Sequence, residues 1–243
     1  RLAKPLDPFW TASMKYQVEN IKIYDMSTDA SPELGREAGS RSKSAVTLAL
    51  TYDTRDNVFL TRKGERLEIS SEFAGGPLYG QTNIHKVSID AQKWFLLPYD
   101  IIFSVNASTG LVDRYGDSEF VPIFDRWFVG GSRSVRGFDY REVGPRDSKS
   151  EPRGGKTYGY MNYEVTFPVI DRVRFAVFTD MGFVDDSYFD YGSVLDEVQI
   201  GSGVGLRLNL PIGPLRLDFG VPVKATKENQ SSGKFHFDVG YQF

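Results

Sequence analysis

The sequence predicts an all-β protein in which antiparallel strands follow one another up and down, as in a transmembrane β-barrel. Three observations support this class: apolar and polar residues alternate with period 2, aromatic residues are abundant, and short connections alternate with long ones. The 243 residues include 18 Phe and 13 Tyr, yet their mean hydropathy is −0.33. Strands with one apolar and one polar face account for both properties.

About ten segments show the alternation of a strand with one apolar face. In the first, Trp10 and every second residue as far as Val18 are apolar, and the residues between them are polar. The last begins at Phe235 and ends on Phe243. No segment has the apolar spacing of a convincing helix. The other strands are expected around residues 46–52, 67–69, 87–91, 101–107, 161–167, 175–177, 204–208 and 215–219.

The connections distinguish a membrane barrel from a soluble sandwich. Because short and long connections alternate along an up-and-down chain, all the long ones lie at one end. Transmembrane barrels have this asymmetry, and a sandwich has no physical reason for it. The short connections are expected at residues 55–63, 98–100, 169–171 and 211–213, and the longer polar ones at 25–41, 74–81, 113–155, 185–197 and 224–233.

The composition argues against several functional classes. The formal net charge is −3, so no nucleic-acid partner is expected. The chain has no Cys and only two His, so neither a disulfide framework nor a zinc site is expected. A glycine run at residues 201–205 lacks the helix that follows a phosphate-binding loop, and we expect it to make room for an inserted loop. We predict no metal, no cofactor and no enzymatic activity.

The longest interval without strand alternation runs from about residue 113 to 155, and its central segment, residues 124–145, has an unusual composition. Gly130, Gly131 and Gly137 permit backbone conformations that other residues rarely adopt. A loop of this length is either functional or disordered, and disordered segments contain few aromatic residues. This segment is rich in them. We therefore predict an ordered loop that docks onto the protein, with Arg136 bound to a carboxylate.

The alternation also indicates which side chains point inward on the two strands after this loop. If Met161, Tyr163, Val165 and Phe167 face lipid, then Glu164 faces the lumen. The same reasoning on the next strand places Asp180 and Gly182 inward, and Gly182 leaves space beside Asp180. An arginine that enters the lumen from the loop would find two carboxylates there.

Three motifs together resemble the barrel of the BamA superfamily, the outer-membrane protein assembly factors and their relatives. They are GGSRSVRGF in the loop, FTDMG at residues 178–182 and the terminal strand that ends on an aromatic residue. The resemblance covers nearly the whole chain. It implies that residues 1–243 form about the last ten strands of a sixteen-stranded barrel, with a lumen-inserted loop at about 114–155. The early strands and the POTRA domains would be absent.

The resemblance also implies roles for particular residues. The VRGF element would form a lock inside the lumen. The terminal strand would be a β-signal, the segment that outer-membrane proteins present to the assembly machinery. The lock would consist of Val135, Arg136, Gly137, Phe138, Glu164, Asp180 and Gly182, and the β-signal would contain Phe235, Phe237, Gly240, Tyr241 and Phe243.

The implied function is the folding and insertion of other outer-membrane proteins, by strand addition at a lateral seam and without chemical catalysis. The implied location is the bacterial outer membrane, with the long loops outside and the C-terminus on the periplasmic side. The implied partners are the lipid bilayer, unfolded outer-membrane proteins, a periplasmic POTRA region and accessory lipoproteins. Two alternatives stay open: a pore of the two-partner-secretion type, and a barrel that anchors an upstream enzyme such as a patatin-like lipase.

We expect Arg136 to contact Asp180, with Glu164 nearby. Phe237, Tyr241 and Phe243 share one parity, and we expect all three to face lipid. About ten strands would leave little lumen for the loop, because lumen width grows with strand number. The chain is therefore expected to be part of a larger barrel, in which the strand that begins at Trp10 is an unpaired edge without a ladder to the terminal strand.

Overall fold

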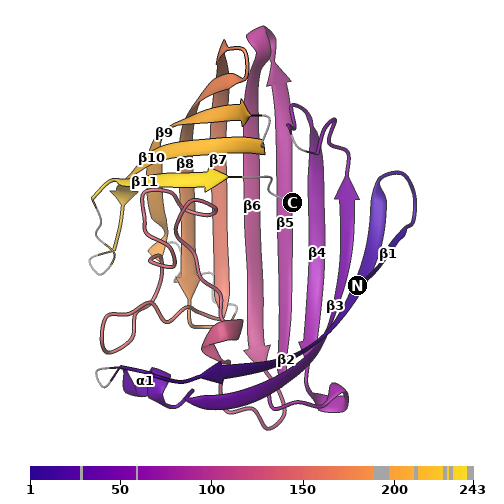
Figure 1. The fold of residues 1–243 in the computed structure, drawn as a ribbon, viewed down its shortest axis with the longest axis vertical. Coiled ribbons are helices and arrows are strands. Elements are labelled where there is room, and N and C mark those ends of the chain that lie inside the picture. Colours follow the sequence, from indigo (N-terminus) through magenta and orange to yellow (C-terminus); the bar gives the residue numbers. More distant parts are fainter. Residues whose placement is uncertain are drawn as a thin grey trace.

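A computed structural model describes residues 1–27, 30–58, 60–188, 197–210, 213–226, 229 and 232–239. Within these residues, eleven strands form one antiparallel sheet in which each strand pairs only with its neighbours in sequence. The sheet curves into an open trough, and the long connection at residues 115–156 lies on its concave side (Figure 1). The predicted all-β, up-and-down class is confirmed.

The strands are β1 (Leu2–Pro5), β2 (Trp10–Ile23), β3 (Gly39–Asp53), β4 (Gly64–Ala74), β5 (Ile84–Leu97), β6 (Ile101–Arg114), β7 (Thr157–Ile170), β8 (Val173–Asp185), β9 (Gln199–Leu210), β10 (Gly213–Lys224) and β11 (Lys234–Val239). Helical structure among the described residues is limited to single turns in the connections. The turns described over their whole length are α1 (Pro32–Gly35), η1 (Gly76–Leu78), η2 (Pro98–Asp100) and η3 (Ile123–Asp125).

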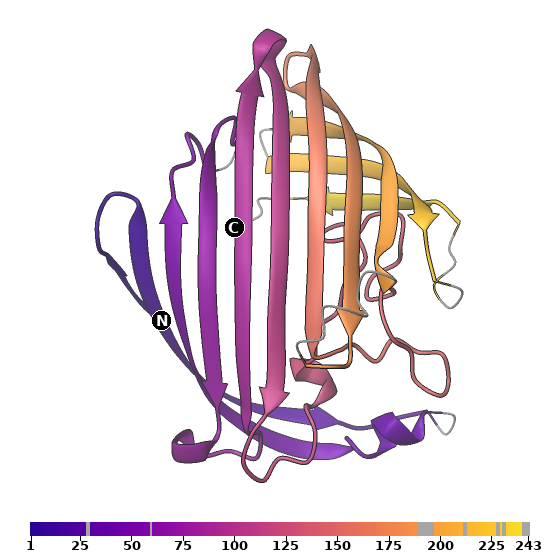
Figure 2. The same cartoon turned by 180° about the vertical axis from the view of Figure 1, so that it is seen from behind.

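The central strands are long enough to cross a bilayer. β5, β6 and β7 have 14 residues each. At about 3.3 Å per residue such a strand is roughly 45 Å long, which spans a hydrocarbon core of about 30 Å even at a tilt of about 45°. Figure 2 shows these strands side by side from the convex side. Among the described residues, no helix is both long and apolar enough to cross a membrane.

The two faces of the sheet differ as the alternation predicts. On β8, Ala176, Phe178 and Asp180 are buried, whereas Phe175 and Val177 are 37% and 44% exposed. The exposed parity continues on the other strands and forms an apolar belt on the convex face. This belt includes Leu48, Leu50, Ile69, Ile89, Val204, Leu206 and Phe219.

The first edge of the sheet differs from the prediction. β1 was not predicted, because its four residues are too few to show alternation. It pairs with residues 11–14 of β2, so the prediction of an unpaired edge was wrong for this part of β2. At the other end, β11 pairs with β10 alone within the described residues. The two ends of the sheet therefore share no ladder in the described part of the chain, as expected.

The buried apolar core lies between the loop and the concave face. One cluster joins the loop to β7 and β8, and a second joins Val121 of the loop to inward residues of β3, β4, β5 and β6. The loop therefore supplies a large part of the hydrophobic interior, which explains why it is ordered despite its length. The first cluster contains Val129, Val135, Phe138, Val143, Tyr158 and Val184.

Candidate functional site

The loop between β6 and β7 is organised by its own backbone contacts. Isolated bridges pair Trp127 with Gly155 and Val129 with Val143. Beyond the second bridge, the amide of Gly131 donates to the carbonyl of Val135 at 3.2 Å. These contacts narrow the loop into a tip, residues 130–143, that carries the VRGF element.

Arg136 at this tip contacts Asp180 of β8, as expected. Its Nε and Nη2 atoms donate to the two carboxylate oxygens at 2.7 and 2.8 Å, and its backbone amide donates to Oδ2 at 3.0 Å. Arg136 is 2% exposed and Asp180 is fully buried. Burial lowers the pKa of Arg136, but the hydrogen bond with Asp180 and the charges of the surrounding carboxylates together raise it by more. The pKa therefore lies above its ordinary value. A bidentate pair of this kind fixes the orientation of both groups.

Two further carboxylates contact the same guanidinium. Glu164 of β7 accepts a hydrogen bond from Arg136 Nη1 at 2.7 Å, and Asp218 of β10 lies 3.5 Å from that atom. Arg207 of β9 links the two carboxylates, because its Nη1 donates to Asp218 at 2.7 Å and its Nη2 to Glu164 at 2.5 Å. The loop tip is thus bound to four consecutive strands, β7 to β10, by one network of charges. Such a network keeps buried charges paired.

Asp218 and Arg207 were not predicted. Both lie at inward positions of strands whose apolar residues face outward, at residues 215–219 and 204–208. Arg216, also at an inward position, lies 3.8 Å from Glu164 and 3.7 Å from Asp218. Charged residues at inward positions next to the predicted carboxylates are a signal that could have found all three, because buried charges need partners.

The other residues of the VRGF element pack the tip onto the strands. The Arg136 guanidinium carbon lies 3.4 Å from the centroid of the Phe178 ring, which is a cation–π contact. Val135 and Phe138 are fully buried. A Cβ added at Gly182 would lie 2.7 Å from Cγ2 of Val135, so Gly182 makes room for the loop as predicted.

Two strand glycines allow the loop backbone to approach the sheet. At Gly201 of β9, an added Cβ would lie 1.9 Å from the carbonyl oxygen of Arg136. At Gly220 of β10, it would lie 2.6 Å from the amide nitrogen of Gly137. A larger residue at either position would displace the loop. Gly201 therefore makes room for the loop as expected, whereas Gly203 of the same run lies against Phe178 and the β10 backbone.

A second set of contacts holds the start of the loop to the early strands. Asp125 forms a buried ion pair with Lys43 of β3. The ammonium group of Lys86 on β5 lies 3.9 Å from the centroid of the Trp127 ring. The loop is therefore attached to both sides of the trough. This attachment was not predicted, because no local pattern links residues 43 and 125.

Replacing Lys43 by alanine is expected to loosen the start of the loop and leave its tip in place. Asp125 would remain buried without its ion-pair partner but would keep its interaction with the charge of Lys86, so the expected cost is about 1–3 kcal/mol. Limited trypsin digestion should then cleave faster at Arg126 while Arg136 stays protected, whereas Lys93→Ala should change neither rate. Equal acceleration at Arg126 and Arg136 would show that the two attachments are not independent.

The residues predicted for the terminal β-signal are only partly described. Phe235 and Phe237 on β11 are 66% and 61% exposed and point away from the loop, as their parity predicts. Gly240, Tyr241 and Phe243 lie outside the described residues.

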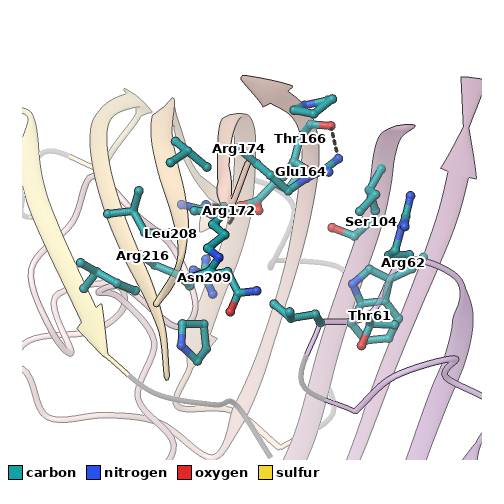
Figure 3. A pocket seen from close by; sticks show the side chains of 18 of the residues that line it. Thr61, Arg62, Ser104, Glu164, Thr166, Arg172, Arg174, Leu208, Asn209 and Arg216 are labelled. Atoms are coloured by element: carbon teal, nitrogen blue, oxygen red, sulfur yellow. Dashed lines mark hydrogen bonds and ion pairs between the residues drawn. The ribbon is translucent and has the colours of Figure 1, made fainter. Parts of the chain in front are cut away.

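A cavity of about 700 Å³ lies beside the lock. Figure 3 shows Glu164, Arg174 and Arg216 on one side of it, with Arg62 facing them from the other. Asp100 on the cavity wall pairs with Arg62 and accepts a hydrogen bond from Arg174 at 2.7 Å. Within the described ranges, no group of three His, Cys, Asp or Glu residues could hold a metal ion. The ion pairs and packing contacts around Arg136 are suited to holding the loop in place.

A curved up-and-down sheet with a loop bound to its concave face by a buried arginine defines the class: an antiparallel sheet of the β-barrel type with a loop on its inner face. The model of the Omp85 superfamily domain matches residues 1–243. The chain belongs to the Omp85 superfamily, and the resemblance seen in the sequence is confirmed.

Several proteins are similar in sequence to this chain over all or part of its length. It is 29% identical to the outer membrane protein assembly factor BamA of Nitratidesulfovibrio vulgaris, over 100% of this chain and 31% of that protein. It is 30% identical to the human sorting and assembly machinery component 50 homolog, over 62% of this chain and 32% of that protein. The chain thus spans about a third of the length of these relatives.

The fold is similar to that of a solved BamA. The crystal structure of Haemophilus ducreyi BamA lacking POTRA domains 1–3 superposes with a TM-score of 0.80 at 17% identity. The match covers 99% of this chain and 53% of that one. At this identity the likeness concerns the fold.

Proposed function

We propose that the protein folds and inserts other outer-membrane proteins in the bacterial outer membrane, and that it does so by presenting a strand edge, without chemical catalysis. The observation that carries the proposal is the buried pair of Arg136 and Asp180, which fixes an ordered loop inside a barrel wall. Similarity to proteins named as assembly factors supports the same role.

In this proposal the apolar belt faces the lipid bilayer. The long connections are extracellular, and the short turns and the C-terminus lie on the periplasmic side. Further strands complete the barrel beyond β1 and β11, whose outer edges have no partner strand within the described residues. The partners are unfolded outer-membrane proteins, a periplasmic POTRA region and accessory lipoproteins.

Insertion by strand addition requires a strand edge to which a client can pair, and β11 offers one. β11 pairs with β10 on one side, and in the described part of the chain no strand pairs with its other side. An incoming client strand can add there through main-chain hydrogen bonds, which accept many sequences. An exposed edge also promotes unwanted pairing, so its position needs to be controlled. The loop packed beside it is suited to that control.

A pore of the two-partner-secretion type would use the lumen as the path for its client. The contacts of the loop favour the edge instead, because the tip is bound to β7–β10 and the start of the loop to β3. A chain that crosses the lumen would have to displace this packed segment. The two functions therefore predict different sites of contact with the client.

A photo-crosslinker placed on the full-length protein distinguishes the two functions. At Phe237 on β11 it should capture a client arrested during assembly, whereas at Asn106, which lines the cavity, it should capture little. The measurement is the yield of crosslinked client in intact cells. Greater capture at Asn106 would contradict the edge mechanism and favour the pore, and capture at neither position would contradict both.

A further inference from the structure

The inward face of the last strand is polar, although the strand lies at the edge of the sheet. Residues 234–239 read KFHFDV, so polar and apolar residues alternate. Phe235, Phe237 and Val239 are exposed on the outer face. The inward residues Lys234, His236 and Asp238 therefore form a polar row, and each of them contacts the loop tip.

Every second residue of β11 from Lys234 to Asp238 makes one of the three contacts. Lys234 Nζ lies 2.6 Å from Asp139 Oδ2. The amide of Gly137 donates to Nε2 of His236 at 3.0 Å.

The third contact is an arginine pair at the far end of the row. Both Nε and Nη2 of Arg133 donate to the carboxylate of Asp238 at 3.3 Å. The loop numbers fall from 139 to 133 as the strand numbers rise from 234 to 238, so the loop tip runs antiparallel along the inner face of β11. The middle contact adjoins Arg136, the residue that is locked to Asp180.

Taken singly, the two outer pairs are weak, because Arg133 and Asp139 are largely exposed and exposed ion pairs contribute little. Together, the two pairs can nevertheless hold β11, because they form on a loop tip that is already ordered. The buried lock at Arg136 already orders the loop tip, so little additional conformational entropy is lost when the tip binds β11. Among the described strands β11 has only one neighbour, with which it pairs over residues 215–220 of β10. The loop is therefore its second support.

We infer that loop residues 133–139 clamp the last strand through Lys234, His236 and Asp238, which act as positioning residues for the edge of the sheet. The clamp couples two features that are far apart in the sequence. The loop locked inside the barrel sets the position and mobility of β11, and release of the three contacts frees the strand. The consequence for client strands rests on the proposed function, whereas the clamp itself does not.

The test measures hydrogen–deuterium exchange of the amides of residues 235–239 in the full-length protein in lipid vesicles. Arg133→Asp alters only the loop and places a like charge beside Asp238. It should speed exchange of these amides about threefold to tenfold, the size expected when a partly exposed ion pair is lost and replaced by repulsion. The double variant Arg133→Asp/Asp238→Arg restores opposite charges and should return exchange to near the original rate.

A second pair of variants tests the middle contact. Gln at position 236 can still accept a hydrogen bond from Gly137, whereas Leu cannot. Exchange of β11 should therefore be faster in His236→Leu than in His236→Gln. Lys93→Asp, which breaks an ion pair with Glu65 on strands remote from the loop tip, should leave β11 unchanged.

Two results would overturn the clamp: unchanged exchange of β11 in Arg133→Asp, or failure of the charge-reversed pair to restore the original rate. Client insertion is measured separately in the same vesicles. If exchange responds as expected and client insertion does not change in any of these variants, then the clamp stands and the proposed use of the β11 edge fails. The two failures are thus distinguishable.

Discussion

Replacing Arg136 by alanine is expected to lower the free energy of unfolding by about 3–5 kcal/mol, because removal of one partner from a buried ion pair leaves the other charge uncompensated. Asp180 is fully buried, and its carboxylate accepts three hydrogen bonds from Arg136: two from the guanidinium group and one from the backbone amide. The measurement is urea unfolding of the full-length protein in lipid vesicles. Arg133→Ala is the matched control: it removes an arginine from the same loop, but its pair with Asp238 is exposed and contributes at most about 1 kcal/mol.

The same measurement tests whether Arg136 and Asp180 act as a pair. Asp180→Ala should also destabilise the protein, and the double variant should lose less than the sum of the two single losses. Contacting residues of this kind show interaction energies of about 0.5–3 kcal/mol. Simple addition of the two effects would mean that the residues are not coupled, and the lock would then not depend on their contact.

Gly201→Val is expected to be the next most damaging change. An added Cβ would lie 1.9 Å from the carbonyl oxygen of Arg136, which belongs to the loop backbone and cannot easily move. Overpacking of this kind costs about 1–3 kcal/mol, and here relief requires withdrawal of the loop tip. Trypsin should therefore cleave at Arg136 and Arg141 in folded Gly201→Val.

The control for this change is Ser202→Val. It adds the same branched side chain one residue further along β9, where the side chain contacts Thr179 and not the loop. Cleavage within the loop should match that of the unaltered protein. If Gly201→Val leaves the loop equally resistant to trypsin, then the close approach of the loop backbone to β9 is not maintained in the membrane.

The strands and their faces could be predicted because alternation is a local property of the sequence. Glu164 and Asp180 were placed inward by parity alone, and the structure finds both beside Arg136. β1 could not be predicted, because four residues are too few for a period to show. The parity of Phe235 and Phe237 was also predictable. The role of the inward polar residues of β11 was not, because it depends on their contacts with the loop tip.

The residues that contact the loop were harder to predict than the fact that the loop is ordered. Glycines and aromatic residues indicated that the loop docks, and parity together with the resemblance indicated Asp180 as a partner. The contact of Asp125 with Lys43 joins residues 82 positions apart, and no local pattern relates them. Asp218 and Arg207 enter the site because β9 and β10 curve over the loop tip, which is a property of the whole sheet. Long-range partners of this kind depend on the curvature of the sheet.

One disulfide measurement tests directly whether the loop tip is bound to the concave face of the sheet in the membrane. Residues 1–243 contain no cysteine, so within them a disulfide can form only between engineered cysteines. At Gly182 an added Cβ lies 2.7 Å from Cγ2 of Val135, so the two side chains meet, as a disulfide with a Cβ separation of about 3.8 Å requires. Val135→Cys/Gly182→Cys should therefore form a disulfide in the folded full-length protein, seen as a mobility shift that reductant reverses. Val135→Cys/Gly159→Cys, whose second cysteine has the opposite parity on β7, should form none. Free thiols at both positions of the first pair in folded protein would contradict the account.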